Sequence, residues 1–86
     1  MRLYTLSWLP NNGNIVDVNP EALLAGKYKR EDLIGKNFIQ TVVAKESRRK
    51  ALFTATQTLK GKKFRDVELI LQSTDGDKVE FYARLV

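Results

Sequence analysis

Two stretches of the chain alternate between apolar and polar residues, and this period of two indicates β-strands. In the first stretch Tyr4, Leu6 and Trp8 share one face, with small polar residues between them. The sequence Pro-Asn-Asn-Gly at positions 10–13 then favours a turn, and residues 15–18 return as a second strand. The N-terminal part is therefore predicted to be a β-hairpin.

The second alternating stretch is longer and lies near the C-terminus. Val67, Leu69 and Leu71 face one way along it. The sequence Ser-Thr-Asp-Gly-Asp at positions 73–77 predicts a turn, and the residues 78–85 alternate again on the way back. This pattern predicts a second β-hairpin.

The segment between the two hairpins carries helix signals. Asn19 can cap a helix that starts at Pro20 and ends at Gly26, and Gly35 can end a second, short helix. Apolar residues within positions 38–43 recur at spacings of one, three and four, which predicts a single turn held in the core. The hairpins are therefore predicted to be connected by short helices.

A longer helix is predicted over residues 46–60, and Gly61 ends it. Its expected buried stripe is apolar apart from one threonine and consists of Leu52, Phe53, Ala55, Thr56 and Leu59. Three basic residues at positions 48–50 lie near its N-terminus, where positive charge opposes the helix dipole. They are either a tolerated surface feature or a contact kept for a partner.

The composition is that of one ordinary globular domain. The chain has 86 residues, of which 43% are hydrophobic and 29% charged, so its core is modest. No apolar run reaches the roughly 18–20 residues needed to cross a bilayer, and the N-terminus does not resemble a signal peptide. A cytoplasmic location without a membrane span is the default expectation.

Cysteine and histidine are both absent from the chain. Disulfides, a cysteinyl flavin adduct and His-ligated haem are therefore excluded, and no metal site is predicted. The serines lack a histidine partner, and the glycines stand singly rather than in a phosphate-binding loop. We therefore do not expect an enzyme, while a small ligand held without a covalent bond stays open.

The net charge of +5 is concentrated in the middle of the chain. From Lys27 to Arg65, twelve basic residues stand against three acidic ones. Such a surface can attract nucleic acid, an acidic protein or anionic lipid, but basic residues on outer helix faces more often serve only for solvation. Solvation is the favoured interpretation.

Four short motifs, taken in order, resemble the PAS domain family. They lie at residues 13–22 (Gly-Asn-Ile-Val-Asp-Val-Asn-Pro-Glu-Ala), 28–36 (Tyr-Lys-Arg-Glu-Asp-Leu-Ile-Gly-Lys), 45–48 (Lys-Glu-Ser-Arg) and 74–76 (Thr-Asp-Gly). Their order and separations carry the resemblance, which covers nearly the whole chain. It implies an α+β fold in which an antiparallel sheet of about five strands carries short helices on one face.

Only four strands are found before Val86. In the family the last strand lies in the middle of the sheet beside the first, so its absence would leave unpaired backbone edges. We therefore expect residues 1–86 to form a single PAS-like domain that is a fragment of a longer multidomain protein. Otherwise another chain completes the sheet, through a homodimer or strand exchange.

The resemblance also implies a function. PAS domains are sensory or signal-transduction modules that bind a small ligand or mediate dimerisation, and they regulate an attached output domain. Such an output domain would be a histidine kinase of a two-component system, a cyclic-dinucleotide enzyme or a transcription regulator. The signal and the output are not specified by this chain.

A ligand in such a module would lie between the sheet and the helices. The candidate lining residues here are Phe38, Val42, Leu52, Phe53, Thr56, Leu59, Leu69, Leu71 and Phe81. The favoured interpretation is that they simply form the core of a small domain. Tyr4, Leu6 and Trp8 are candidate interface residues, although Trp8 is also interpretable as a core residue or as a stacking partner of a ligand.

The alternative function is that of a small basic domain that binds nucleic acid. Its phosphate contacts would come from Arg48, Arg49, Lys50, Lys60, Lys62, Lys63 and Arg65. Aromatic residues for base stacking are not interleaved with these, apart from Phe64. Nucleic acid is therefore the less favoured partner.

Overall fold

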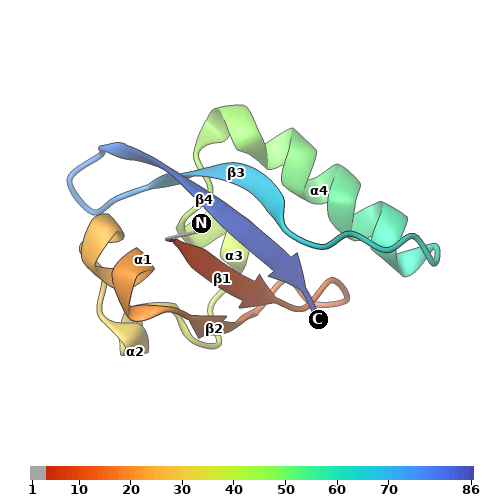
Figure 1. Ribbon diagram of the computed structural model, residues 1–86, viewed down its shortest axis with the longest axis horizontal. Helices are drawn as coiled ribbons and strands as arrows, with labels where there is room; N and C mark the ends of the chain where they lie inside the picture. The colour runs from red at the N-terminus through yellow and green to blue at the C-terminus, as the bar shows by residue number, and fades with distance from the viewer. Residues whose placement is uncertain (1–3) are drawn as a thin grey trace.

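The computed structural model describes residues 4–86 and confirms the predicted α+β class. Within these residues, strands and helices follow one another in the predicted order (Figure 1). They are β1 (Thr5–Trp8), β2 (Ile15–Val18), α1 (Pro20–Gly26), α2 (Arg30–Leu33), α3 (Phe38–Thr41), α4 (Lys45–Leu59), β3 (Val67–Gln72) and β4 (Lys78–Leu85).

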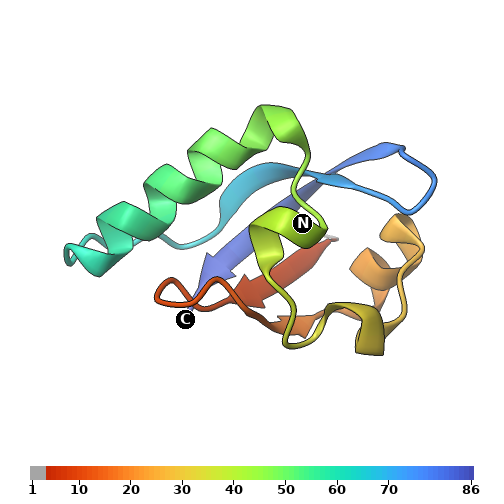
Figure 2. The same cartoon turned by 180° about the vertical axis from the view of Figure 1, so that it is seen from behind.

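The strands form one sheet in the order β2-β1-β4-β3. Helices α3 and α4 lie across one face of this sheet, whereas α1 and α2 stand beside one end of it (Figures 1 and 2). Alternation along the strands turns side chains such as Leu6, Leu69 and Phe81 into the buried layer. The hydrophobic core therefore lies between one face of the sheet and the helices.

The pairing of β1 with β4 differs from the expected antiparallel arrangement. These two strands run parallel, with Leu6 opposite Ala83, while the other two strand pairs are antiparallel. The backbone N–H of Tyr82 donates to the carbonyl of Tyr4 at 2.9 Å. The expectation of unpaired edges beside β1 is therefore wrong for this structure, because β4 takes the neighbouring place and bonds to β1.

The two outer edges of the sheet are largely covered by neighbouring chain. Beside β2, the N–H of Ile15 donates to the Lys36 carbonyl at 2.9 Å, and the Gly35 N–H donates to the Ile15 carbonyl at 2.8 Å. Beside β3, the N–H of Gln72 donates to the Val42 carbonyl at 2.7 Å. This cover leaves little backbone of the described strands open for the addition of another strand.

Helix α1 begins with the cap that the sequence predicts, but its end differs from the prediction. The side chain of Asn19 accepts a backbone N–H of the first turn at 3.0 Å, so the predicted cap is confirmed. At the other end Gly26 remains helical, and Lys27 takes the left-handed conformation with φ 60°. Gly26 is needed for space, because a Cβ there would lie 2.8 Å from the Tyr28 ring and 3.1 Å from Leu71.

The first turn of α4 is bonded directly to β3. Ala44 precedes the helix without a side-chain cap, is fully buried, and donates its N–H to the Ile70 carbonyl at 2.9 Å. The hydroxyl of Ser47 accepts the Ile70 N–H at the same distance of 2.9 Å. These bonds hold the start of the helix close to the sheet, so only small side chains fit beneath it there.

Candidate functional site

Three aromatic rings occupy the space between the sheet and α3. The centroid of the Phe38 ring lies 4.6 Å from that of Trp8 and 5.7 Å from that of Phe81. All three side chains are at most 2% exposed. Tilted and edge-on contacts of this kind are favourable for aromatic rings. The space in which a PAS-type ligand would lie is thus packed with protein side chains here.

Five of the nine candidate lining residues belong to this buried layer. They are Phe38, Val42, Leu69, Leu71 and Phe81. Their contacts join α3, β3 and β4 into one hydrophobic cluster. A ligand among them would require these side chains to move apart.

The other four candidates lie on the outside of α4. Leu52, Phe53 and Leu59 are 57%, 61% and 62% exposed, and Thr56 is exposed as well. The predicted buried stripe of this helix is therefore wrong, apart from Ala55. The face that turns to the sheet carries small side chains instead, namely Ser47, Ala51, Thr54 and Ala55. The hydrogen bonds of Ala44 and Ser47 to β3 hold the start of α4 against the sheet, and small side chains suit such a close contact.

The three candidate interface residues of β1 pack into the core. Leu6 and Trp8 are buried, and Tyr4 is half-buried against the same cluster. Of the three interpretations of Trp8, its position supports the core. The interface assignment of Leu6 and Trp8 is therefore corrected, because these two side chains have almost no surface to offer a partner.

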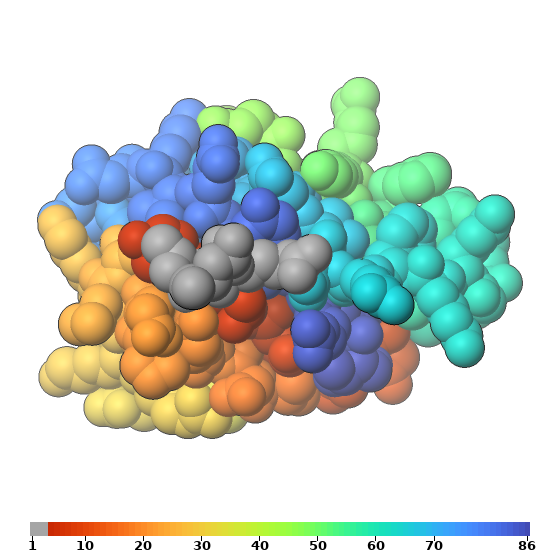
Figure 3. Space-filling view, in the orientation of Figure 1, coloured from red at the N-terminus to blue at the C-terminus, as the bar shows by residue number. Residues whose placement is uncertain are grey.

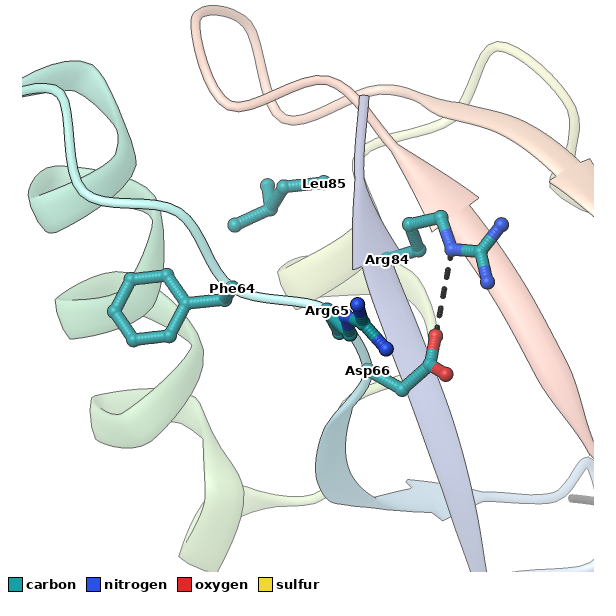
Figure 4. A pocket seen from close by; sticks show the side chains of 5 residues that line it. All are labelled: Phe64, Arg65, Asp66, Arg84 and Leu85. Atoms are coloured by element: carbon teal, nitrogen blue, oxygen red, sulfur yellow. Dashed lines mark hydrogen bonds and ion pairs between the residues drawn. The ribbon is translucent and has the colours of Figure 1, made fainter.

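Residues 60–66 form the linker between α4 and β3. A hollow of about 440 Å³ opens at the surface where this linker leads into β3. The last pair between β3 and β4 is Val67 opposite Ala83, so the end of β4 lies beside the linker instead of a strand. The residues that line the hollow are Phe64, Arg65, Asp66, Arg84 and Leu85 (Figure 4). The hollow thus results from β4 extending past its neighbour.

The hollow has an apolar side and a charged side. The ring of Phe64 points toward α4, while the side chains of Arg84 and Asp66 face each other (Figure 4). The Nε of Arg84 lies 3.4 Å from a carboxylate oxygen of Asp66. A group that combines an apolar part with an anion suits such a lining. The sequence does not reveal this site, because the site depends on where two strands stop pairing; the signal that the sequence offers is a phenylalanine, Phe64, among basic residues.

Several acidic side chains form ion pairs with lysine or arginine. Arg30 donates to Asp17 at 2.9 Å, and this hydrogen bond lowers the pKa of the Asp17 carboxyl. Lys78, at 2.7 Å, likewise lowers the pKa of Glu46. Across residues 4–86, no three acidic side chains gather in a way that could hold a metal ion. Carboxyls held in the charged form suit ion pairing better than proton transfer at neutral pH.

Positive charge is concentrated on α4 and the linker that follows. Residues 45–65 hold eight basic side chains and one acidic side chain, Glu46, which pairs with Lys78. Two of the basic side chains, Arg48 and Lys50, donate to backbone carbonyls. The remaining six form no ion pair with any described residue: Lys45, Arg49, Lys60, Lys62, Lys63 and Arg65.

Comparison with known proteins supports the resemblance drawn from the motifs. A family model described as PAS domain matches residues 4–86, which is nearly the whole chain. The comparison with curated proteins gives no match. Over the described part of the chain, no helix combines the length and apolar character needed to cross a bilayer.

Proposed function

The chain belongs to the PAS domain family of sensory and interaction modules, and we propose that it acts in the cytoplasm as an interaction module that controls an attached output domain. One contrast carries this proposal. The rings of Trp8, Phe38 and Phe81 pack together inside, whereas Leu52, Phe53 and Leu59 stand exposed on α4. A domain that senses a ligand needs interior space to hold it, whereas an interaction module needs exposed apolar surface for a partner.

The attached output would be a histidine kinase of a two-component system, a cyclic-dinucleotide enzyme or a transcription regulator. A partner that binds one of two packing arrangements more tightly shifts the balance toward it, and the output domain responds to that shift. Interaction rather than chemistry is favoured because the acidic side chains Asp17 and Glu46 are engaged in surface ion pairs.

A chimeric histidine kinase tests this function. The chain replaces the PAS domain of a kinase whose autophosphorylation depends on that domain, and the rate is compared with a kinase that lacks any such domain. We expect the folded chain to change the rate and the core variant Phe38→Ala to abolish the change. Equal rates for all three proteins would contradict the proposal.

Self-association is part of the proposed function. Because β1 pairs with β4 and the sheet edges are covered, a second copy would pack against the sheet face that lies away from the helices rather than add a strand. Thr5, Ser7 and Tyr82 lie on strand faces that turn away from the buried layer. Light scattering after size exclusion would show about twice the 9.8 kDa chain mass for a dimer, and the single chain mass at high concentration would contradict it.

The unpaired basic side chains favour one second candidate, a nucleic-acid-binding domain. Six cations between Lys45 and Arg65 are available for phosphate contacts. Fluorescence anisotropy with a mixed-sequence DNA duplex and an RNA strand would give binding that weakens steeply with salt. Absence of binding at low salt would remove this candidate.

A further inference from the structure

The outward side of α4 combines large apolar side chains with basic ones. We call it the α4 outer face, and it consists of Arg49, Leu52, Phe53, Thr56, Leu59 and Lys60. Leu52, Thr56 and Leu59 follow the spacing i, i+4, i+7, so they form one stripe along the helix. Phe53 is adjacent to this stripe. Three large apolar residues are thereby gathered within about two turns.

Single exposed hydrophobic residues are common on protein surfaces, but a cluster on one helix face requires an explanation. The inner face of α4 shows that this helix does not lack burial, because small residues such as Ala51 already pack there. The C-terminal half of α4 and its linker also protrude at one end of the molecule, opposite α1 and α2 (Figure 3). The α4 outer face is therefore accessible to a partner.

Basic side chains border the apolar cluster at both ends of the helix. Arg49 lies three residues before Leu52 and four before Phe53, so it stands over the same turn. Lys60 follows Leu59 directly at the other end. Neither Arg49 nor Lys60 forms an ion pair with a described residue. An apolar centre with a charged border is the usual arrangement of a protein interface.

The positive charge and the spacing of these residues indicate which kind of partner binds the α4 outer face. A second copy would bring the same excess of positive charge against itself, which is repulsive. On a lipid surface the apolar residues should form a separate face, yet Arg49, Phe53, Thr56 and Lys60 share one stripe at i, i+4, i+7 and i+11. Binding of nucleic acid would not explain why Leu52 and Leu59 are exposed. A protein segment with both apolar and acidic side chains can contact the apolar residues of the α4 outer face and pair with its basic ones.

Building on the interaction role proposed above, we propose that the α4 outer face binds an acidic amphipathic segment of a partner protein. Leu52, Phe53 and Leu59 contact the apolar side chains of that segment, and Arg49 and Lys60 pair with its carboxylates. A helix of 15 residues is about 22 Å long, so a partner segment of about four turns covers it. The face of one helix is a small contact by the standards of stable complexes, so we expect weak and transient binding.

The probe is a synthetic, fluorescein-labelled helical peptide of about 15 residues. It carries leucine at positions spaced i, i+3, i+4, i+7 and i+8, and glutamate at most other positions. One control peptide has lysine for every glutamate, and a second has serine for every leucine. Binding to the full chain is followed by anisotropy and mapped by amide chemical shifts. We expect the acidic amphipathic peptide to bind and both control peptides to bind at least about tenfold more weakly.

Matched surface variants locate the contact. Phe53→Ser is compared with Leu24→Ser, which alters a leucine that is 79% exposed on α1. Arg49→Glu is compared with Lys36→Glu, a charge reversal at an exposed site outside α4. We expect Phe53→Ser and Arg49→Glu each to weaken binding about tenfold, and their controls to change it less than about twofold. Thermal melts verify that all four variants remain folded.

Three results would overturn the inference. The first is that the amide chemical-shift changes caused by the acidic peptide lie outside α4. The second is that Phe53→Ser and wild type bind this peptide with equal affinity. The third is that the acidic peptide does not bind, whereas anionic vesicles or duplex DNA bind and Phe53→Ser abolishes that binding. The chimeric kinase separates this inference from the proposed function. If the kinase responds to the chain but the peptide does not bind α4, only the inference fails; if the peptide binds but the kinase is indifferent, only the proposed function fails.

Discussion

Large hydrophobic residues are buried in the interior beneath α3 but exposed on the outer side of α4. Beneath α3, Phe38 packs between Trp8 and Phe81 and is fully buried. On α4, Phe53 is 61% exposed while Ala51 is buried beneath the same helix. The difference follows from how each helix meets the sheet: α3 contributes a large ring to the core, whereas α4 is hydrogen-bonded to β3 at its start and turns only small side chains inward.

The size of apolar residues alone therefore does not identify the buried face of a helix. Hydrophobic burial is worth about 25 cal/mol per Å² of apolar surface, so leaving Phe53 and its neighbours exposed forgoes stability. A helix that uses alanine and threonine inside and leucine and phenylalanine outside is therefore better suited to binding than to maximal stability.

The largest expected effect comes from truncating the same residue type in the two regions. Phe38→Ala removes a ring with two aromatic contacts and should lower the free energy of unfolding by about 3–5 kcal/mol. Phe53→Ala should change it by less than about 0.5 kcal/mol, because the ring is mostly exposed. Urea unfolding followed by circular dichroism measures both. Similar losses for the two variants would break the distinction between the regions.

A smaller effect should follow from enlarging the inner face of α4. Ala51→Leu places a large side chain where the helix approaches the sheet, and overpacking of this kind costs about 1–3 kcal/mol. Leu52→Ala, its neighbour on the outer face, is the matched control and should change stability by less than about 0.5 kcal/mol. A stabilising Ala51→Leu would mean that there is room beneath α4 and that its close packing is not what selects small residues.

The sequence predicted most elements of this fold but not the faces of α4. Alternation along Val67, Leu69 and Leu71 reveals a strand because its period is local, and Asn19 reveals a cap because the bond is local. The orientation of α4 involves instead hydrogen bonds of Ala44 and Ser47 with Ile70 of β3, which lies more than 20 residues further along the chain. The parallel pairing of β1 with β4 likewise joins segments far apart in the chain.

The candidate site shows the same limit. The sequence predicts Phe38 and Phe81 between the sheet and the helices, and both side chains are buried there. The hollow beside Phe64 could not be expected, because it exists only where β4 extends past β3. Likewise, the apolar cluster on α4 appeared in the sequence as a stripe, but only its position relative to the sheet shows that it faces outward.

The smallest expected effect concerns the surface ion pairs, which should contribute little compared with the interior. The hydrogen bond from Arg30 lowers the pKa of Asp17 below its ordinary value of 3.8. The ion pair therefore stabilises the fold above that pH, and its contribution is lost as the pH falls through the lowered pKa of the folded state. Asp17→Asn should cost only a few tenths of a kcal/mol at neutral pH and nothing in strong acid.

Thermal melts between neutral pH and about pH 2 measure this difference. Glu80→Gln is the control, because Glu80 forms no ion pair among residues 4–86. A gap between wild type and Asp17→Asn that widens on acidification would contradict the assigned role of the ion pair.

Native mass spectrometry of the chain purified without additives shows whether the space between the sheet and the helices holds a ligand or is filled by protein side chains alone. We expect species at the bare mass of the chain or of its dimer, near 9.8 kDa per copy, with no component that is lost on denaturation. A small molecule that copurifies, leaves on denaturation and is no longer retained when Phe38 or Phe81 is replaced would contradict it, because the packed core would then be a ligand pocket.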